Sequence, residues 1–252
     1  MLRKAPARTA KKIRMTSQNK ELTFVEHLEE LRWRLIKSLA CLVLSCIVFY
    51  HYIDQVLHFL IRPFGQLYFV SPSEALEAHV TLTLCGGVVL ASPFILYQFW
   101  QFLAAAVNPE FKKNAVFFTA LSFVLFVTGC AFAYFAVLPF SASFLLSFSS
   151  DVIKPMMTVS KYINFITTLI FSFGIIFEFP LMMLFLIQIG IATPEFLIQK
   201  RRYAIVAIFI ISAVLTPPDY VSQLLMAFPL MGLYELSIFM AKWNYSSKHY
   251  AV

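Results

Sequence analysis

Charged residues are scarce in this sequence. Asp, Glu, Lys and Arg make up only 13% of its 252 residues, whereas 60% are hydrophobic and 28 are phenylalanine. A soluble domain of this composition could not cover its surface with polar groups. The scarcity of charge therefore excludes an ordinary soluble domain and indicates a protein embedded in a membrane.

Cysteine is also rare, and its placement excludes two kinds of stabilising site. The four cysteines all lie in uncharged runs, and no two of them form a C-x-x-C pair. Neither a disulfide framework nor a zinc site is indicated. We expect them to be small packing residues of a helical bundle. They are Cys41, Cys46, Cys85 and Cys130.

Catalytic motifs are missing as well. The sequence has no H-E-x-x-H, no G-x-S-x-G and no glycine-rich phosphate loop, and its histidines lack metal-ligand spacing. We therefore expect a protein that is not an enzyme and that uses no metal or other cofactor.

Long uncharged runs define the fold class. A helix needs about 20 apolar residues to cross a hydrocarbon core roughly 30 Å thick, and four runs are long enough. Two shorter runs joined by the turn "TPPDY" are expected to form a short helical hairpin in locally thinned membrane. The predicted fold is all-α, a polytopic membrane protein with six spans, of which the last two are short. Their expected bounds are about 36–53, 80–104, 115–138, 162–188, 203–215 and 221–240.

Lysine and arginine predict the orientation. With the N-terminus inside, 17 basic residues lie on the cytoplasmic side and three, Arg62, Lys154 and Lys161, lie outside. By the positive-inside rule both termini face the cytoplasm, so the net charge of +7 reflects topology and does not indicate a nucleic-acid partner. We expect a disordered basic tail over 1–21, a transmembrane domain over 22–242 and a cytoplasmic tail over 243–252.

Prolines lie inside or at the ends of several expected spans. Each interior proline removes a backbone hydrogen bond and kinks its helix, so several together are expected to bend the bundle into a concave wall. We also expect the third span to leave the membrane near Pro139, with residues 139–150 forming an amphipathic external segment. The prolines are Pro93, Pro139, Pro180 and Pro229.

A single carboxylate interrupts the fourth span. Glu178 lies in "FSFGIIFEFPLMMLFLIQ", where an acid at a helix centre costs roughly 2.5–3.5 kcal/mol. Gly174, four residues earlier, allows close approach of a neighbouring backbone, and Pro180 frees the carbonyl group of Ile176. Glu178 is thus predicted to be functional, as a polar contact or a proton relay. The alternative is a protonated, hydrogen-bonded packing residue.

The segment "LTFVEHLEELRWRLIKSL" is predicted to be a helix on the cytoplasmic surface that then turns into the first span. Glu26 and Glu30 are four residues apart and share a face, and Arg34 follows four residues later. Two interpretations remain open: a Glu30–Arg34 surface pair, or an acidic patch that meets a cation.

Four segments together resemble the TatC family, the multispanning receptor subunit of the twin-arginine protein translocase. They are "HLEELRWRL", "SPFILYQFWQF", "GIIFEFP" and "LTPPDYVSQ", in that order. The resemblance extends from about Leu22 to Trp243. It implies a core subunit that binds twin-arginine signal peptides and exports folded proteins with the proton-motive force. It also implies small single-span partner subunits of the TatA and TatB type, a homo-oligomer within a larger complex, and a location in the bacterial inner membrane, or alternatively the mitochondrial inner or thylakoid membrane.

The resemblance also implies roles for particular residues. Signal-peptide binding is expected at Glu30, Arg32, Phe102 and Glu110, an intramembrane polar site at Glu178, and structural or partner contacts at Pro63, Pro93, Pro180 and Asp219. The loop "NPEFKKN" departs from the family pattern, because Phe111 separates Glu110 from the two lysines that the family places directly after its glutamate.

Recognition of arginine by Glu30 and Glu110 has a physical basis. The planar guanidinium forms bidentate pairs with carboxylates that lysine cannot copy. One rival hypothesis is a secondary transporter or ion channel that uses Glu178 as an ion site, although such proteins commonly show inverted repeats, and none is visible here. A passive scaffold for other membrane subunits is a third possibility, and it would need no cytoplasmic acid pair.

Overall fold

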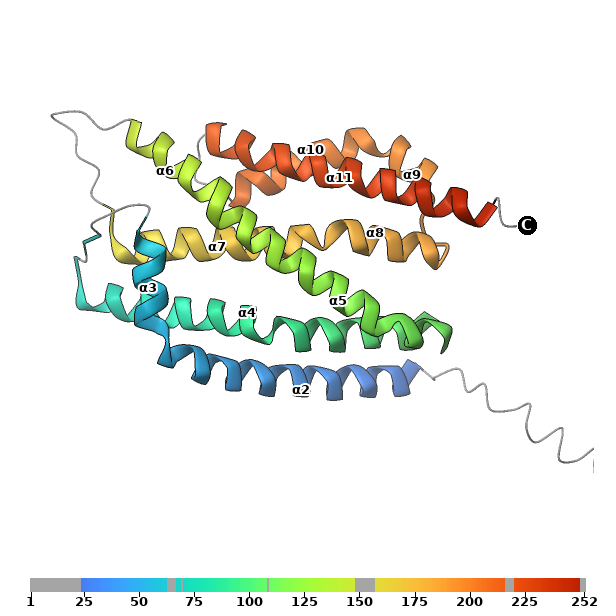
Figure 1. The fold of residues 1–252 in the computed structure, drawn as a ribbon, viewed down its shortest axis with the longest axis horizontal. Helices are drawn as coiled ribbons and strands as arrows, with labels where there is room; N and C mark the ends of the chain where they lie inside the picture. Colours follow the sequence, from blue (N-terminus) through green and yellow to red (C-terminus); the bar gives the residue numbers. More distant parts are fainter. Residues whose placement is uncertain are drawn as a thin grey trace, which may run out of the picture.

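The computed structural model describes residues 24–62, 67–68, 70–107, 109–147, 157–215 and 220–249. These residues are almost entirely helical, and a single residue pair, Tyr68 with Thr158, forms an isolated β-bridge among them. The long helices run roughly side by side, while α5 crosses them diagonally (Figure 1). The predicted all-α class is confirmed. The expected tail over 1–21 and the turn "TPPDY" lie outside the described residues, apart from its last residue, Tyr220.

The first helix, α2, runs without a break from Phe24 to His51. The prediction of a surface helix that turns into the first span is wrong. No proline or glycine occurs between these residues, so nothing in the sequence interrupts the backbone ladder. At about 1.5 Å per residue the helix is roughly 42 Å long, and the chain first bends at Tyr52, before α3 (Ile53–Ile61).

Helix α4 (Pro72–Val107) lies beside α2, and the contact depends on two glycines. A Cβ atom on Gly87 would lie 2.3 Å from the sulfur of Cys46, and one on Gly86 would lie 2.1 Å from the ring of Phe49. Only a residue without a side chain fits at such distances. Cys46 is therefore a packing residue at this contact.

The third long segment is α5 (Pro109–Phe132), followed by a π-helical turn, η1 (Ala133–Val137), and by α6 (Leu138–Ser147). A separate external segment after Pro139 was expected, but the helix continues to Ser147. Pro139 has no N–H to donate to the carbonyl four residues earlier. The wider turn just before it is closed by the N–H of Leu138, which donates to the carbonyl of Ala133.

Helices α7 (Val159–Phe177) and α8 (Phe179–Gln188) are separated at Glu178, two residues before Pro180. Pro93 and Pro229, in contrast, lie inside helices that continue past them. Gly190, with φ of +79°, ends α8 in a conformation that favours glycine. The short α9 (Pro194–Gln199) follows, capped by the hydroxyl of Thr193.

The last two helices differ in length more than the sequence suggested. Helix α10 (Arg201–Leu215) has 15 residues, about 22 Å at 1.5 Å per residue. Helix α11 (Tyr220–His249) has 30 residues and continues past the predicted end of the sixth span. Among the described residues, four helices are long and apolar enough to cross a membrane. They are Glu26–His51, Pro72–Ala104, Ala115–Phe144 and Val159–Gln188. The count of six spans stays a prediction, and α10 would need thinned membrane.

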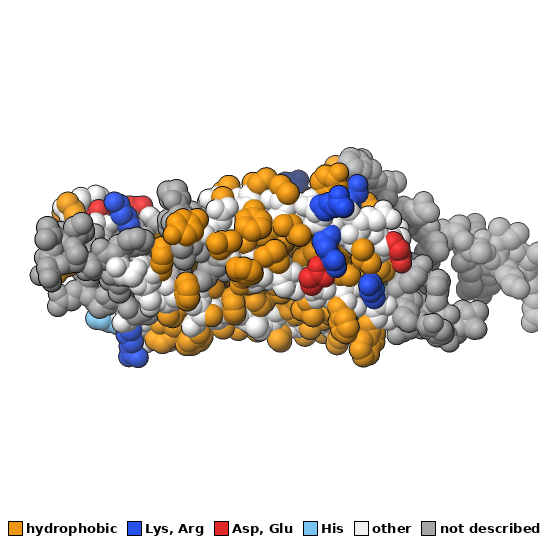
Figure 2. Space-filling model, turned by 90° about the horizontal axis from the view of Figure 1, so that it is seen from above, with side chains coloured by type: hydrophobic (Ala, Val, Ile, Leu, Met, Phe, Trp, Pro, Cys, Tyr) orange, Lys and Arg blue, Asp and Glu red, His pale blue; other side chains and the backbone are white. Residues whose placement is uncertain are grey.

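The surface fits a membrane environment. Figure 2 shows hydrophobic side chains over the middle of one face, with charged side chains toward its two ends. One end, which we call the basic end, is formed by the start of α2, the end of α4, the α9–α10 link and the end of α11 (Figure 1). Its described basic residues are Arg32, Arg34, Lys37, Lys200, Arg201, Arg202 and Lys242.

Polar contacts join helices at the opposite end. Glu77 of α4 accepts hydrogen bonds from the hydroxyl of Ser160 at 2.8 Å and from the amide of Asn164 at 3.0 Å, both on α7. At the basic end Arg201 of α10 pairs with Glu235 of α11 at 2.8 Å. These contacts fix helix positions at the two ends of the bundle.

Candidate functional site

The first candidate site lies at the basic end, where α2 meets α4. Glu30 accepts two hydrogen bonds from Arg34, from Nε at 3.1 Å and from Nη2 at 2.5 Å, both on Oε1. The third donor of Arg34, Nη1, bonds to the side-chain oxygen of Gln98 on α4 at 3.2 Å. The Glu30–Arg34 pair that the spacing suggested is thus formed, and Gln98 ties it to the second long helix.

An aromatic stack lies on the same two helices. Phe102 of α4 stacks on His27 of α2 with ring centroids 4.4 Å apart and an angle of 15° between the planes. Phe102 lies one helical turn beyond Gln98. His27 lies about one turn before Glu30 and two turns before Arg34, so both pairs share one face of the α2–α4 contact. The structure therefore brings Phe102 near Glu30, as the predicted site requires.

For the other two predicted binding residues, the described part of the structure shows no contact with Glu30. Arg32 is exposed on α2. Glu110 lies in the first turn of α5, directly after Pro109; its side chain is not among those described. The expected loop is therefore helical from residue 109 onward, because proline favours the first position of a helix.

Of the four residues predicted to make structural or partner contacts, two are described by the structure and two are not. Pro63 and Asp219 lie outside the described residues. Pro93 is exposed on α4, and Pro180 is buried in the first turn of α8. Pro180 thus lies two residues after Glu178, at the break between α7 and α8.

Glu178 forms the second candidate site, at the break between α7 and α8. Its Oε2 accepts a hydrogen bond of 2.5 Å from the hydroxyl of Ser122 on α5. Its Oε1 is buried and has no hydrogen-bond partner among the described residues. One oxygen of the carboxyl group thus accepts a hydrogen bond within the protein, and the other is buried without one among the described residues.

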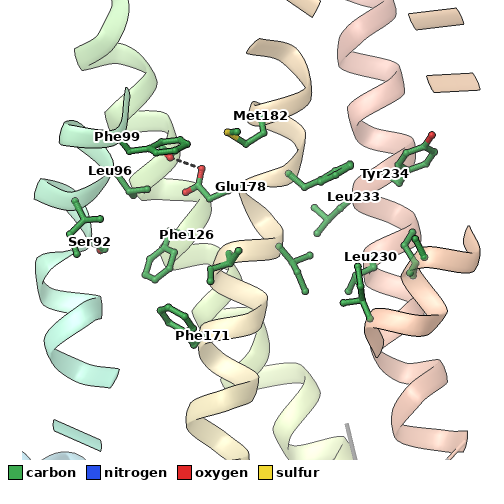
Figure 3. Close-up of a pocket in the computed structure, with 18 of the residues that line it drawn as sticks. Ser92, Leu96, Phe99, Phe126, Phe171, Glu178, Met182, Leu230, Leu233 and Tyr234 are labelled. Carbon is green, nitrogen blue, oxygen red and sulfur yellow. Dashed lines mark hydrogen bonds between the residues drawn. The ribbon is translucent and has the colours of Figure 1, made fainter. Parts of the chain in front are cut away.

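Glu178 lines a cavity of about 620 Å³ that is almost wholly apolar. The side chain points toward the wall formed by α4 and α5, whereas Leu230, Leu233 and Tyr234 of α11 line the opposite wall (Figure 3). The polar side chains of the lining besides Glu178 are Ser92, Ser122 and Tyr234. None of the residues that line the cavity is a proline, so the concave wall expected from proline kinks stays a prediction.

The cavity lining carries little charge. Glu178 is the single carboxylate of the lining, which contains no histidine, lysine or arginine. The described residues also contain no group of three His, Cys, Asp or Glu side chains that could hold a metal ion. An apolar hollow with one buried acceptor suits an apolar partner that brings a hydrogen-bond donor.

Two residues of these sites were missed by sequence reasoning. Gln98 and Ser122 are uncharged polar residues inside long apolar helices, and both are buried. Gln98 lies four residues before Phe102, which was a usable signal because that spacing places both on one helix face. Ser122 carried no such signal, since it lies 56 residues from Glu178.

The fold is that of a multi-pass membrane protein. The chain belongs to the TatC family: residues 26–229 match the family described as Sec-independent protein translocase protein (TatC). Eight similar proteins are each named as a Sec-independent protein translocase protein. The chain is accordingly a translocase component and not an enzyme.

Similar proteins cover nearly the whole chain. The translocase protein TatC of Carboxydothermus hydrogenoformans is 40% identical over 231 residues, which span 90% of this chain and 95% of that protein. TatC of Aquifex aeolicus is 38% identical and spans 88% of this chain and 95% of its own. A crystal structure titled twin-arginine translocase receptor TatC matches with a TM-score of 0.79 and 38% identity, covering 86% of this chain and 99% of that one.

Proposed function

We propose that this protein is the signal-peptide receptor and core subunit of a twin-arginine translocase in a bacterial inner membrane, with both termini in the cytoplasm. The observation that carries the proposal is the position of Glu30 at the basic end. Its side chain is 25% exposed, and Oε2 accepts no hydrogen bond from any described residue. A carboxylate held in place with one oxygen open can receive an arginine from a peptide.

The surroundings of Glu30 suit a signal peptide. The Phe102–His27 stack offers a flat aromatic face on the same helices. Guanidinium groups bind aromatic faces as well as carboxylates, whereas an ammonium group lacks the planar geometry. Arg32 and Glu110 complete the proposed binding site, with Arg32 exposed two residues after Glu30 on α2 and Glu110 at the start of α5.

The cavity around Glu178 supports the proposed partners. A single-span subunit of the TatA or TatB type presents an apolar helix, and the buried, unpaired Oε1 of Glu178 would accept a hydrogen bond from a polar group on it. The same surface could receive the apolar part of an inserted signal peptide. Copies of the chain would then assemble with these subunits and the surrounding lipid into a larger complex.

The alternative of an ion-transporting protein has less support. An ion site in a membrane generally gathers several polar groups at one depth. The cavity lining contains Glu178 as its one carboxylate, together with hydroxyl groups and apolar side chains. No described feature of the cavity favours a transported ion over a partner helix.

A peptide-binding measurement tests the proposal. The full-length protein, purified in detergent, is titrated with a fluorescent signal peptide bearing two consecutive arginines and with the same peptide bearing two lysines. We expect tighter binding of the arginine peptide by at least tenfold, and loss of that binding in Glu30→Ala. Equal binding of the two peptides by the wild-type protein contradicts the proposed function.

A further inference from the structure

The carboxylate of Glu30 is not an isolated negative charge. Arg34 donates both Nε and Nη2 to Oε1, so the pair as a whole is neutral. Gln98 holds the third nitrogen of Arg34 from the neighbouring helix. The guanidinium is therefore fixed from two sides and cannot easily turn away from Glu30.

The Glu30–Arg34 pair leaves one carboxylate oxygen for a second cation. Both bonds of Arg34 end on Oε1, and Oε2 is left without a described partner. The two side chains are 25% and 19% exposed, so the open oxygen can be reached from water. A second cation can bind to Oε2 only beside the guanidinium of Arg34.

A guanidinium group and an ammonium group are expected to bind to this oxygen with different affinities. A carboxylate offers about four lone-pair positions, so two guanidinium groups can share it. The guanidinium is planar, its charge is delocalised, and it is weakly hydrated, so it can lie next to another with little repulsion. An ammonium group is compact and strongly hydrated. Beside Arg34 it meets a concentrated like charge and gains no net attraction to offset its lost hydration.

We propose that Arg34, held on Glu30 by Gln98, is a specificity-determining residue that lets Glu30 accept an arginine and reject a lysine. The selectivity arises because the affinity for lysine is lowered, and not because the affinity for arginine is raised. This inference rests on the proposed function of Glu30 in signal-peptide binding. It assigns the discrimination to Arg34 and not to the acidic residue itself.

The test measures peptide selectivity in two variants of the full-length protein. Arg34→Gln removes the charge next to Glu30. Gln98→Leu keeps every charge but removes the bond that holds Arg34 in place. Lys37→Gln is the matched control, because it removes one positive charge from α2 at an exposed position with no described contact to Glu30. Each protein is titrated with the twin-arginine and the twin-lysine peptide, and its thermal unfolding is recorded.

The expected result is a change in the ratio of the two affinities. One unit charge about 6 Å away alters an affinity by about 3- to 100-fold as the effective dielectric constant falls from about 80 to about 20. For Arg34→Gln we expect twin-lysine binding to tighten about tenfold, and twin-arginine binding to change less than about threefold. Gln98→Leu should shift the ratio in the same direction by a smaller factor, and Lys37→Gln should keep the wild-type ratio.

The outcomes separate this inference from the proposed function. If the wild-type protein prefers the arginine peptide, and Arg34→Gln and Gln98→Leu keep the full preference, the inference is overturned while the function stands. The same holds if Lys37→Gln lowers the ratio as much as Arg34→Gln does, because net charge alone would then explain the change. If the wild-type protein shows no preference, the proposed function is contradicted and the inference with it.

Discussion

Ser122 of α5 donates a hydrogen bond of 2.5 Å to Oε2 of Glu178 and so connects α5 to the break between α7 and α8. Oε2 therefore has a hydrogen-bond partner within the protein. The other oxygen, Oε1, is buried without a described partner. Among the described residues, Oε1 is therefore the half of the Glu178 carboxyl group that has no hydrogen bond.

Replacement of Glu178 by glutamine and by alanine separates a polar contact from a proton relay. Glutamine keeps a hydrogen-bonding side chain without a titratable group, whereas alanine removes both. We expect Glu178→Gln to retain substantial export of a folded reporter protein. We expect Glu178→Ala to lose about 1–3 kcal/mol of partner interaction, and with it most export.

The measurement is reporter export in a strain that lacks its own copy of the protein. The amount of each variant in the membrane is the control, because a variant that fails to accumulate says nothing about the contact. Equal loss of export in both variants at normal membrane levels would show that the titrating proton is needed.

Removal of the Glu30 side chain should weaken signal-peptide capture. A charge-assisted hydrogen bond at a partly exposed site is worth about 1.5–3 kcal/mol, or roughly ten- to a hundredfold in affinity. Glu29→Ala is the matched control, since Glu29 is the preceding residue of α2 and is exposed. Crosslinking of a twin-arginine peptide should fall in Glu30→Ala and persist in Glu29→Ala. Unchanged crosslinking in Glu30→Ala would remove Glu30 from the site.

Single cysteines test the predicted orientation. The four native cysteines are first replaced, and a cysteine is then placed at Lys161, in the first turn of α7, or at Gln199, at the end of α9, both of which are exposed. The predicted topology puts Lys161 outside and Gln199 inside. A membrane-impermeant thiol reagent added to intact cells should label Lys161→Cys only. Labelling of Gln199→Cys but not of Lys161→Cys would contradict the predicted topology.

A glycine pair predicts where α5 and α7 tolerate no side chain. A Cβ atom on Gly129 would lie 2.5 Å from the backbone oxygen of Phe173, whereas one on Gly232 of α11 would meet no atom within 4 Å. We expect Gly129→Ala to destabilise the protein by about 1–3 kcal/mol through overpacking. Gly232→Ala should stabilise it by up to about 1 kcal/mol, because alanine favours the helix. Thermal unfolding in detergent measures both changes. A Gly129→Ala variant as stable as the wild-type protein would contradict the packing described.

Much of this architecture could be predicted from the sequence, because uncharged apolar runs long enough to span a membrane are typical of transmembrane helices. The lone charge of Glu178 marked its own position, and the spacing of four residues between Glu30 and Arg34 allowed for their pair. The bond from Arg34 to Gln98 spans 64 residues of sequence, so local periodicity carries no trace of it. The bounds of α2 were misjudged for another reason. A change from polar to apolar residues predicts where a membrane surface lies, but not where a helix bends.

The π-helical turn at Ala133–Val137 has a consequence for the register of the third long segment. A π turn holds one residue more than an α turn, so the helix beyond it is rotated relative to the helix before it. Ala133 and Val137 pack into the cluster around Phe173 and Met226, whereas Leu138 packs into a different cluster around Tyr162 and Ile163. Deletion of one residue here would turn the far end by about 100°. Leu138 would then leave its cluster, although every residue of α6 would keep its own helical conformation.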